Sequence, residues 1–240
     1  MRAITTSLLT PVMREPARGR VLDAGCGTGN NLKHLASGGR PVGVDLSEEA
    51  LRFCRSRGVT VARGSLLALP FASGSFDLVT SFDVIYHRWV TDDRAAVGEL
   101  VRVLRPGGHL FVRVPALKML WGAHDEAVHS RHRYTRAELV RLFESCGLEV
   151  VRATYCNSLL FPVLALRRAL DRLLSRHGSD VEELPAPMER TFRALLELEA
   201  WWVRRFSFPV GGSVVALGRK TDIESPHETK GGRNANEGSR

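Results

Sequence analysis

The stretch VLDAGCGTGNN, Val21–Asn31, places three glycines within five positions directly after an apolar run. Gly25, Gly27 and Gly29 have no Cβ, so the chain can turn tightly there and a ligand can approach the backbone closely. The turn leads from a predicted strand into a predicted helix, whose first N–H groups then point at the ligand. We therefore expect a ligand-binding turn here, with a tight turn that binds nothing as the alternative.

Two residues near this turn argue against a dinucleotide as its ligand. Dinucleotide-binding turns follow the pattern G-x-G-x-x-G or A, and Asn30 occupies the last position of that pattern. The carboxylate of Asp23 would also repel a pyrophosphate placed at the turn. A ligand with a cationic ammonium or sulfonium group suits the turn better, and an NAD-dependent oxidoreductase is the weaker alternative.

A second acidic residue follows the turn at the spacing of a ribose-binding carboxylate. The segment VGVDLS ends the second predicted strand at Asp45, about twenty positions after Asp23. A carboxylate that only starts the next helix is the alternative interpretation. Because the glycine turn independently predicts an acidic residue at this place, we favour ribose binding.

Strands alternate with helices along the first part of the chain. The strands are continuous apolar runs, which is typical of parallel strands buried on both faces. Right-handed crossovers between such strands build a doubly wound α/β fold, a mostly parallel sheet with helices on both faces. The predicted strands are Val21–Ala24, Pro41–Asp45, Thr60–Ala62, Phe76–Phe82 and His109–Val114, and the predicted helices are Asn30–Ser37, Ser47–Arg57 and Thr91–Leu104.

The second part of the chain completes a predicted sheet of seven strands. A helix capped by Thr135 ends at Gly147, a sixth strand follows it, and the last strand covers residues 213–220. These elements predict one domain over residues 1–220. The tail at 221–240 has almost no apolar residues, so we expect it to be disordered.

A helical insert at 157–211 precedes the last strand. Residues 157–177 and 188–206 predict two amphipathic helices with Leu and Phe stripes, and Trp201–Trp202 stands beside Arg204–Arg205. Such helices are most often a packed cap over the core. Arginine and tryptophan beside apolar faces also suit a bilayer surface, and a dimer interface is the third interpretation.

Composition argues against several classes of protein, among them nucleic-acid-binding, disulfide-rich, zinc-binding and membrane-spanning proteins. The chain has 240 residues, 34 Lys and Arg against 26 Asp and Glu, and a formal net charge of +8, but its arginines are scattered, so we expect no nucleic-acid partner. Its four cysteines lie far apart without a C-x-x-C pair, which argues against a disulfide framework or a zinc site. No run approaches about 18 apolar residues, and no secretory signal opens the sequence. We predict a cytoplasmic protein, with peripheral membrane contact through 157–211 as an alternative.

Four motifs resemble, in order, those of the class I, seven-stranded S-adenosylmethionine-dependent methyltransferases. They are VLDAGCGTG at 21–29, VGVDLSEEAL at 42–51, LALPFASGSFDLVTSFDVIYH at 67–87 and AVGELVRVLRPGGHLFVRVP at 96–115. The resemblance covers roughly residues 15–155 and the final strand. It implies S-adenosyl-L-methionine as cofactor and methyl transfer to a small-molecule or lipid-like acceptor. A methyltransferase-like binding module without turnover is the alternative outside enzymes.

The resemblance also implies which residues bind the cofactor. The glycine turn would pass beneath its methionine part, Asp45 would bind the ribose, and Leu46 would lie against the adenine. Ser65 stands where the family usually has an aspartate toward the adenine amino group, and a serine accepts that hydrogen bond more weakly. The full predicted set is Asp23, Gly25, Gly27, Gly29, Asp45, Leu46, Ser65, Leu66, Ser81 and Phe82, with Asp83 beside them.

Histidines supply the candidates for chemistry and acceptor binding. His87 matches a histidine common in related small-molecule methyltransferases, where the preceding residue is often glutamate rather than Tyr86, and it is the predicted general base. The loop WGAHDEAVHSRHRYT, 121–135, predicts a substrate lid, with a solvated loop or a metal site as alternatives. We expect no metal, and we place three of its residues at the acceptor: His124, Asp125 and Arg133.

Overall fold

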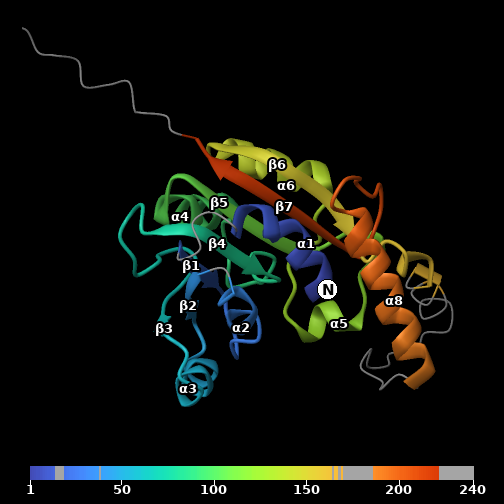
Figure 1. Ribbon diagram of the computed structural model, residues 1–240, viewed down its shortest axis with the longest axis horizontal. Helices are drawn as coiled ribbons and strands as arrows, with labels where there is room; N and C mark the ends of the chain where they lie inside the picture. Colours follow the sequence, from blue (N-terminus) through green and yellow to red (C-terminus); the bar gives the residue numbers. More distant parts are fainter. Residues whose placement is uncertain (14–18, 38, 164, 167–168, 170–185, 222–240) are drawn as a thin grey trace, which may run out of the picture.

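The protein forms one seven-stranded sheet (Figure 1). Its computed structural model describes residues 1–13, 19–37, 39–163, 165–166, 169 and 186–221. The strand order across the sheet is β3-β2-β1-β4-β5-β7-β6. The strands are β1 (Gly19–Ala24), β2 (Gly39–Asp45), β3 (Val61–Arg63), β4 (Phe76–Phe82), β5 (Leu104–Pro115), β6 (Leu148–Cys156) and β7 (Ser213–Lys220).

The sheet confirms the predicted α/β fold and shows where its strand order reverses. β1 pairs in parallel with β2 on one side and with β4 on the other, so the chain turns in opposite directions from β1. The last strand, β7, is antiparallel to both β5 and β6. In such sheets, ligands bind outside the carboxyl ends of the strands at the point of reversal. A ligand site is therefore expected at the carboxyl ends of β1, β2 and β4.

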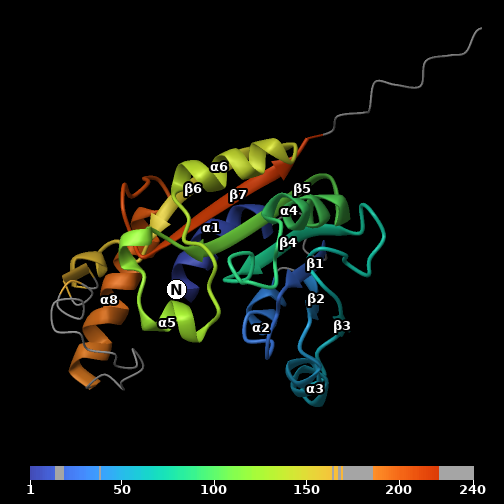
Figure 2. The ribbon, with the colours of Figure 1, turned by 180° about the vertical axis from the view of Figure 1, so that it is seen from behind.

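Helices cover both faces of the sheet, as the two opposite views in Figures 1 and 2 show. One hydrophobic cluster joins the sheet to α4 and α6, and a second joins its other face to α1 and α8. Burial of these apolar side chains is the main stabilising contribution to such a fold. The helices are α1 (Arg2–Met13), α2 (Leu32–Leu35), α3 (Glu48–Ser56), α4 (Asp93–Val103), the 3-10 turn η1 (Lys118–Leu120), α5 (Ala123–Ala127), α6 (Arg136–Ser145) and α8 (Ala186–Trp202).

Two helix starts follow the predicted capping pattern. The hydroxyl of Ser47 accepts a hydrogen bond from Ala50 N, which begins α3. Thr135 and Glu138 form a reciprocal capping box at the start of α6. These local bonds fix the direction in which each helix leaves the preceding strand or loop.

The structure differs from the prediction in three elements. α1 was not predicted, and it is held by Ile4, Leu8 and Leu9 in the second cluster. α2 is a single short turn rather than a helix over Asn30–Ser37. β5 starts five residues early because Leu104 already pairs with Phe76 of β4, and the RPGG segment lies in the register shift between Leu104 and His109, with a positive φ of 72° at Gly107.

The insert and the tail are described only in part. α8 is the second of the two helices predicted for the insert. Most of the first, over 157–177, and the tail at 222–240 lie outside the described residues. Within the part of the chain that the structure describes, no helix is long and apolar enough to cross a bilayer.

A buried carboxylate, that of Asp23, lies near the carboxyl end of β1. Asp23 is 0% exposed and accepts a hydrogen bond from the hydroxyl of Thr80 on β4 at 2.9 Å. Its second oxygen, Oδ2, has no hydrogen-bond partner among the described residues. Burial raises the pKa of Asp23 from its ordinary 3.8 to about 7, and the Thr80 bond only partly opposes this.

This shift predicts a loss of stability at neutral pH. Because the folded-state pKa is raised, the contribution of Asp23 is fully present below pH 4 and is lost as pH rises toward 7. Between pH 5 and pH 7, the wild type should lose about 2 kcal/mol of unfolding free energy relative to Asp23→Asn. Urea unfolding of both proteins at the two pH values measures the difference, and parallel pH dependences would contradict it.

Candidate functional site

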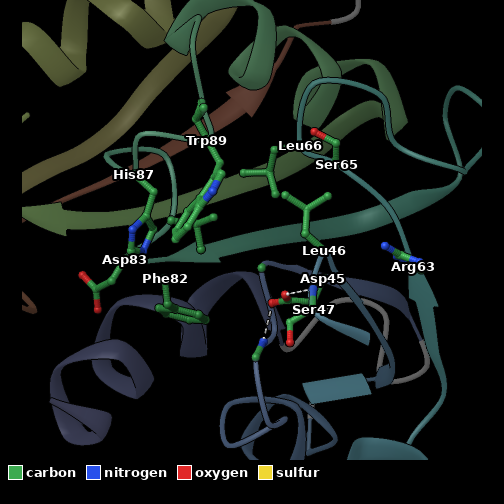
Figure 3. Close-up of a pocket in the computed structure, with 14 residues that line it drawn as sticks. Asp45, Leu46, Ser47, Arg63, Ser65, Leu66, Phe82, Asp83, His87 and Trp89 are labelled. Atoms are coloured by element: carbon green, nitrogen blue, oxygen red, sulfur yellow. Dashed lines mark hydrogen bonds between the residues drawn. The ribbon is translucent and has the colours of Figure 1, made fainter. Parts of the chain in front are cut away.

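A cavity of about 570 Å³ opens at the carboxyl ends of β1, β2 and β4 (Figure 3). This volume falls in the range of small-molecule and cofactor sites. In Figure 3, Leu46, Leu66 and Trp89 point toward one another across the space above Asp45 and Phe82. The cavity is lined by Gly25, Gly27, Asp45, Leu46, Ser47, Arg63, Ser65, Leu66, Phe82, Asp83, Val84, His87, Trp89 and Val90.

The glycine turn forms one wall of this cavity, and its glycines serve different purposes. At Gly25, where φ is 80°, an added Cβ would lie 2.2 Å from a methyl group of Val84, so the turn packs directly on the segment after β4. At Gly27, where φ is 51°, an added Cβ would meet nothing within 4 Å. Gly25 therefore allows close packing, and Gly27 leaves open the space that a ligand would fill.

Asp45, at the end of β2, connects the turn to the next helix. Its Oδ2 accepts a hydrogen bond from Gly27 N at 2.8 Å, and its Oδ1 accepts one from Ser47 N at 2.9 Å. A carboxylate has about four acceptor positions, so these two bonds leave others for a ligand's hydroxyl groups. The backbone thus holds the carboxylate in place at the edge of the cavity.

Two predicted cofactor residues lie behind the cavity wall instead of lining it. Asp23 and Ser81 are both fully buried, and neither is among the lining residues. Ser81 Oγ, like Asp23 Oδ2, has no hydrogen-bond partner among the described residues. Gly29 also lies outside the lining, with Cys54 Sγ 3.0 Å from the position of an added Cβ.

The remaining cofactor candidates line the cavity on its apolar side. Leu46 is half exposed, and Leu66 is buried. The hydroxyl of Ser65 already accepts a hydrogen bond from Leu67 N at 3.1 Å, but it can still accept or donate another. Arg63, at the end of β3, brings a positive charge to this side.

Phe82 and Asp83 close the cavity at the end of β4. Asp83 has a positive φ of 57°, which is uncommon for a residue other than glycine and is typical of functional sites. Arg113, on the neighbouring strand β5, forms an ion pair with the Asp83 carboxylate, and its Nε donates at 3.0 Å. The same guanidinium lies 5.2 Å from the ring centroid of Phe82. This ion pair holds Asp83 in its strained conformation.

His87 lines the same end of the cavity with its ring held between two aromatic side chains. Tyr86 stacks on it at 4.4 Å between centroids, and Trp89 lies at 5.5 Å. His87 Nδ1 has no hydrogen-bond partner among the described residues. Burial raises the pKa of Tyr86 to about 12, so its phenol stays protonated at neutral pH and cannot act as a base there. His87 is the better candidate for accepting a proton.

The loop 121–135 lies against the His87 segment. Arg88 N donates to His129 O at 3.1 Å, and Arg131 N donates to Tyr86 O at 2.8 Å. An isolated β-bridge between His87 and Ser130 completes this pairing. The loop therefore supports the backbone on both sides of His87.

The predicted acceptor residues of this loop do not line the cavity. Asp125 and Arg133 are buried and form an ion pair with each other, with Arg133 Nε donating at 2.7 Å. Arg133 also donates to Ala116 O at 2.9 Å, which ties the loop to the end of β5. His124 is exposed on α5. The geometry favours a role for the buried pair in positioning the loop over direct contact with an acceptor.

Sequence reasoning missed several lining residues. Trp89 and Val90 follow His87 closely, so the motif at the end of β4 could have been extended by three residues to find them. Arg63 directly follows the strand predicted at Thr60–Ala62, and Ser47 lies two positions after the strand predicted at Pro41–Asp45. A position just after a strand is the general signal for a site in this kind of sheet. Val84 is placed only by its contact with Gly25, which the sequence does not indicate. No cluster of three metal-ligating side chains occurs in the described part of the chain.

Comparison with known proteins identifies the family. The methyltransferase domain model matches residues 22–112, from β1 to β5. A probable S-adenosylmethionine-dependent methyltransferase of Mycobacterium tuberculosis is 42% identical over 166 residues, which cover 67% of this chain and 57% of that protein. A malonyl-[acyl-carrier protein] O-methyltransferase of Enterobacter lignolyticus is 36% identical over 137 residues, which cover 52% of this chain and 54% of that protein.

Solved structures agree with this result at the level of the fold. An S-adenosylmethionine-dependent methyltransferase structure from Thermotoga maritima superposes with a TM-score of 0.58 at 24% identity, and covers 92% of this chain and 91% of that one. The chain spans little more than half the length of the two relatives above. With its matching domain, glycine turn, acidic strand end and seven-stranded sheet, the chain belongs to the class I S-adenosylmethionine-dependent methyltransferases.

Proposed function

We propose that this protein transfers a methyl group from S-adenosylmethionine to a small-molecule or lipid-like acceptor. One observation carries the proposal: a single cavity has the glycine turn and Asp45 at one end and His87 and Trp89 at the other. The first end provides groups for a cofactor, and the second provides an aromatic wall and a histidine for an acceptor.

The residues at the first end fit the cofactor. The open space at Gly27 can receive the methionine part, and the oriented Asp45 carboxylate can accept hydrogen bonds from the ribose hydroxyls. Leu46 and Leu66 offer apolar surface to the adenine. The buried oxygen of Asp23 that lacks a partner lies behind this end and favours a positive charge nearby. Asp23 and Ser81 thus act on the cofactor from behind the lining residues, without lining the cavity themselves.

The residues at the second end fit an acceptor that must lose a proton. When bound, the cofactor supplies an electrophilic methyl group on a positively charged sulfur. The chain's contribution is to align the acceptor with that group and to exclude water, which Phe82 and Trp89 can do. The His87 ring, which contacts Tyr86 and Trp89, can accept the proton of an alcohol or phenol at an imidazole nitrogen.

Two observations support the class of acceptor. The cavity wall combines leucine, valine, phenylalanine and tryptophan side chains with few charges, which suits a mostly apolar molecule. One relative is named a malonyl-[acyl-carrier protein] O-methyltransferase, so its acceptor atom is an oxygen. An oxygen acceptor on a small or lipid-like molecule is consistent with both.

The decisive experiment is calorimetric titration with S-adenosylmethionine, S-adenosylhomocysteine and NAD, followed by assay of labelled methyl transfer to a panel of acyl and hydroxylated acceptors. We expect the two adenosyl ligands to bind with a Kd of about 1 µM to 100 µM, and NAD not to bind. Binding without transfer to any acceptor would favour the module without turnover. A signal from NAD alone would overturn the proposal.

Gly27→Val should abolish binding of S-adenosylmethionine, because the branched side chain fills the space left open for the ligand. Gly58→Val is a matched control. Gly58 also has a positive φ, 71°, and open space around it, but it lies after α3 and outside the cavity lining. Calorimetry should show normal affinity for the Gly58 variant. Equal affinities in the two variants would contradict the placement of the cofactor.

Asp45→Ala should weaken S-adenosylmethionine binding about 10-fold to 100-fold, because hydrogen bonds to a charged group contribute about 1.5–3 kcal/mol. Asp45→Asn keeps one acceptor oxygen and should lose less. The same titration measures both variants, and thermal unfolding without ligand shows whether the turn has been disrupted. Unchanged affinity in a folded Asp45→Ala protein would remove this residue from the cofactor site.

His87→Ala should lower kcat about 10²-fold to 10⁴-fold while the Kd for S-adenosylmethionine stays within about twofold, because a general base acts only on the acceptor. His87→Gln keeps a polar group of similar size and should be equally slow. Steady-state kinetics with an acceptor identified in the panel gives the comparison. Turnover equal to that of the wild type in either variant would exclude His87 as the base.

A further inference from the structure

Apolar and basic side chains gather at the end of α8 and in the turn that follows. We call this group the α8 patch: Leu198, Trp201, Trp202, Arg204, Arg205 and Phe206. The exposed fractions of its apolar members are 54%, 60%, 40% and 51% in chain order. Four of the eleven large hydrophobic residues that are exposed in the described chain thus fall within nine positions. Such a cluster marks an interaction surface more often than a chance exposure.

The fold presents the α8 patch rigidly. Ala200 and Val203, on the opposite side of the helix, are buried in the cluster that contains α1. Arg152, on the edge strand β6, donates to Val203 O at 3.0 Å, and Phe208 N donates to Thr154 Oγ1 at 2.9 Å. The turn after α8 is therefore bonded to β6, and its outward side chains are held at the surface.

The charge of the α8 patch is positive. Arg204 and Arg205 are exposed and form no ion pair within the described chain. No acidic residue occurs anywhere between Ala200 and Thr221 in the sequence. In the sequence before the α8 patch, the nearest described residue with an exposed carboxylate is Glu197, one turn earlier on α8 than Trp201. The two guanidinium groups are thus available to an anionic partner.

A second copy of the chain suits this surface poorly. A two-fold dimer places the same patch against itself, so the arginines of the two copies would face one another near the axis. An anionic bilayer surface suits both the apolar and the basic side chains of the α8 patch. Indole rings favour the headgroup level, and arginine side chains are attracted to an anionic membrane surface.

We infer that the α8 patch binds the surface of an anionic lipid bilayer. Trp201 and Phe206 insert at the level of the headgroups, and Arg204 and Arg205 pair with lipid phosphates. Glu199 fixes this surface relative to the sheet, because its Oε2 accepts hydrogen bonds from Ser158 N at 2.9 Å and Leu159 N at 3.3 Å, directly after the carboxyl end of β6. The inference concerns binding alone and does not depend on the proposed reaction.

Vesicle flotation with the full chain tests this inference. Vesicles of phosphatidylcholine with 30% phosphatidylglycerol are compared with phosphatidylcholine alone, at low and at 0.5 M salt. The wild type should float with the anionic vesicles at low salt and should be released by high salt. Arg204→Glu/Arg205→Glu and Trp201→Ala/Phe206→Ala should each reduce the bound fraction about tenfold or more.

Matched variants near the opposite edge of the sheet, at α2, β2 and α3, serve as controls. Lys33→Glu/Arg40→Glu makes the same change in net charge, and Phe53→Ala removes an exposed aromatic ring from α3. Both should bind vesicles like the wild type, and all variants should keep the thermal unfolding midpoint. Equal binding to neutral vesicles, loss of binding in the controls, or no effect of either patch variant would overturn the inference. A dimer in solution that the patch variants dissociate would also overturn it, in favour of a second copy.

Discussion

The carboxylate of Asp45 is the interaction on which the site depends most. One oxygen accepts from Gly27 N and the other from Ser47 N, so a single side chain joins the glycine turn after β1 to the start of α3 after β2. These two segments belong to adjacent parallel strands, which end at the same edge of the sheet. The carboxylate both shapes the cavity and offers its remaining acceptor positions to a ligand. Structure and binding at this end therefore rely on the same group.

This coupling explains why the lining residues at the Asp45 end of the cavity could be predicted from sequence. Its residues follow β1, β2 and β4 directly, and each is marked by a short local signal: glycines in a turn, an acidic strand end or an apolar strand end. Parallel pairing of the strands then brings these signals together without any further information. There are three exceptions: Gly29 packs against Cys54, and Asp23 and Ser81 lie inside the wall. The strands that carry Asp23 and Ser81 were predicted correctly. The direction in which each of these two side chains points, however, depends on the packing of both sheet faces.

The His87 end of the cavity could not be predicted to the same extent, because it is built from contacts between distant segments. Asp125 and Arg133 look like exposed binding residues in the sequence, yet each neutralises the other in a buried pair that no local pattern indicates. Trp89 reaches the cavity through a loop that is held by backbone bonds to residues more than forty positions later. α1 shows the same limit, since its weak pattern becomes a helix only when it packs against the sheet and α8.

The arrangement of α8 bears on the kind of acceptor. A water-soluble acceptor could reach the cavity from any direction, and the position of an aromatic and basic surface would then be irrelevant to the reaction. A lipid-like acceptor stays at the bilayer, so the enzyme must hold its cavity near that surface. Through Glu199 the α8 patch is tied to the carboxyl end of β6, at the sheet edge that also carries the ends of β4 and β5. Membrane binding by the α8 patch would therefore hold this edge of the sheet near the bilayer, which is where a lipid-like acceptor would be found.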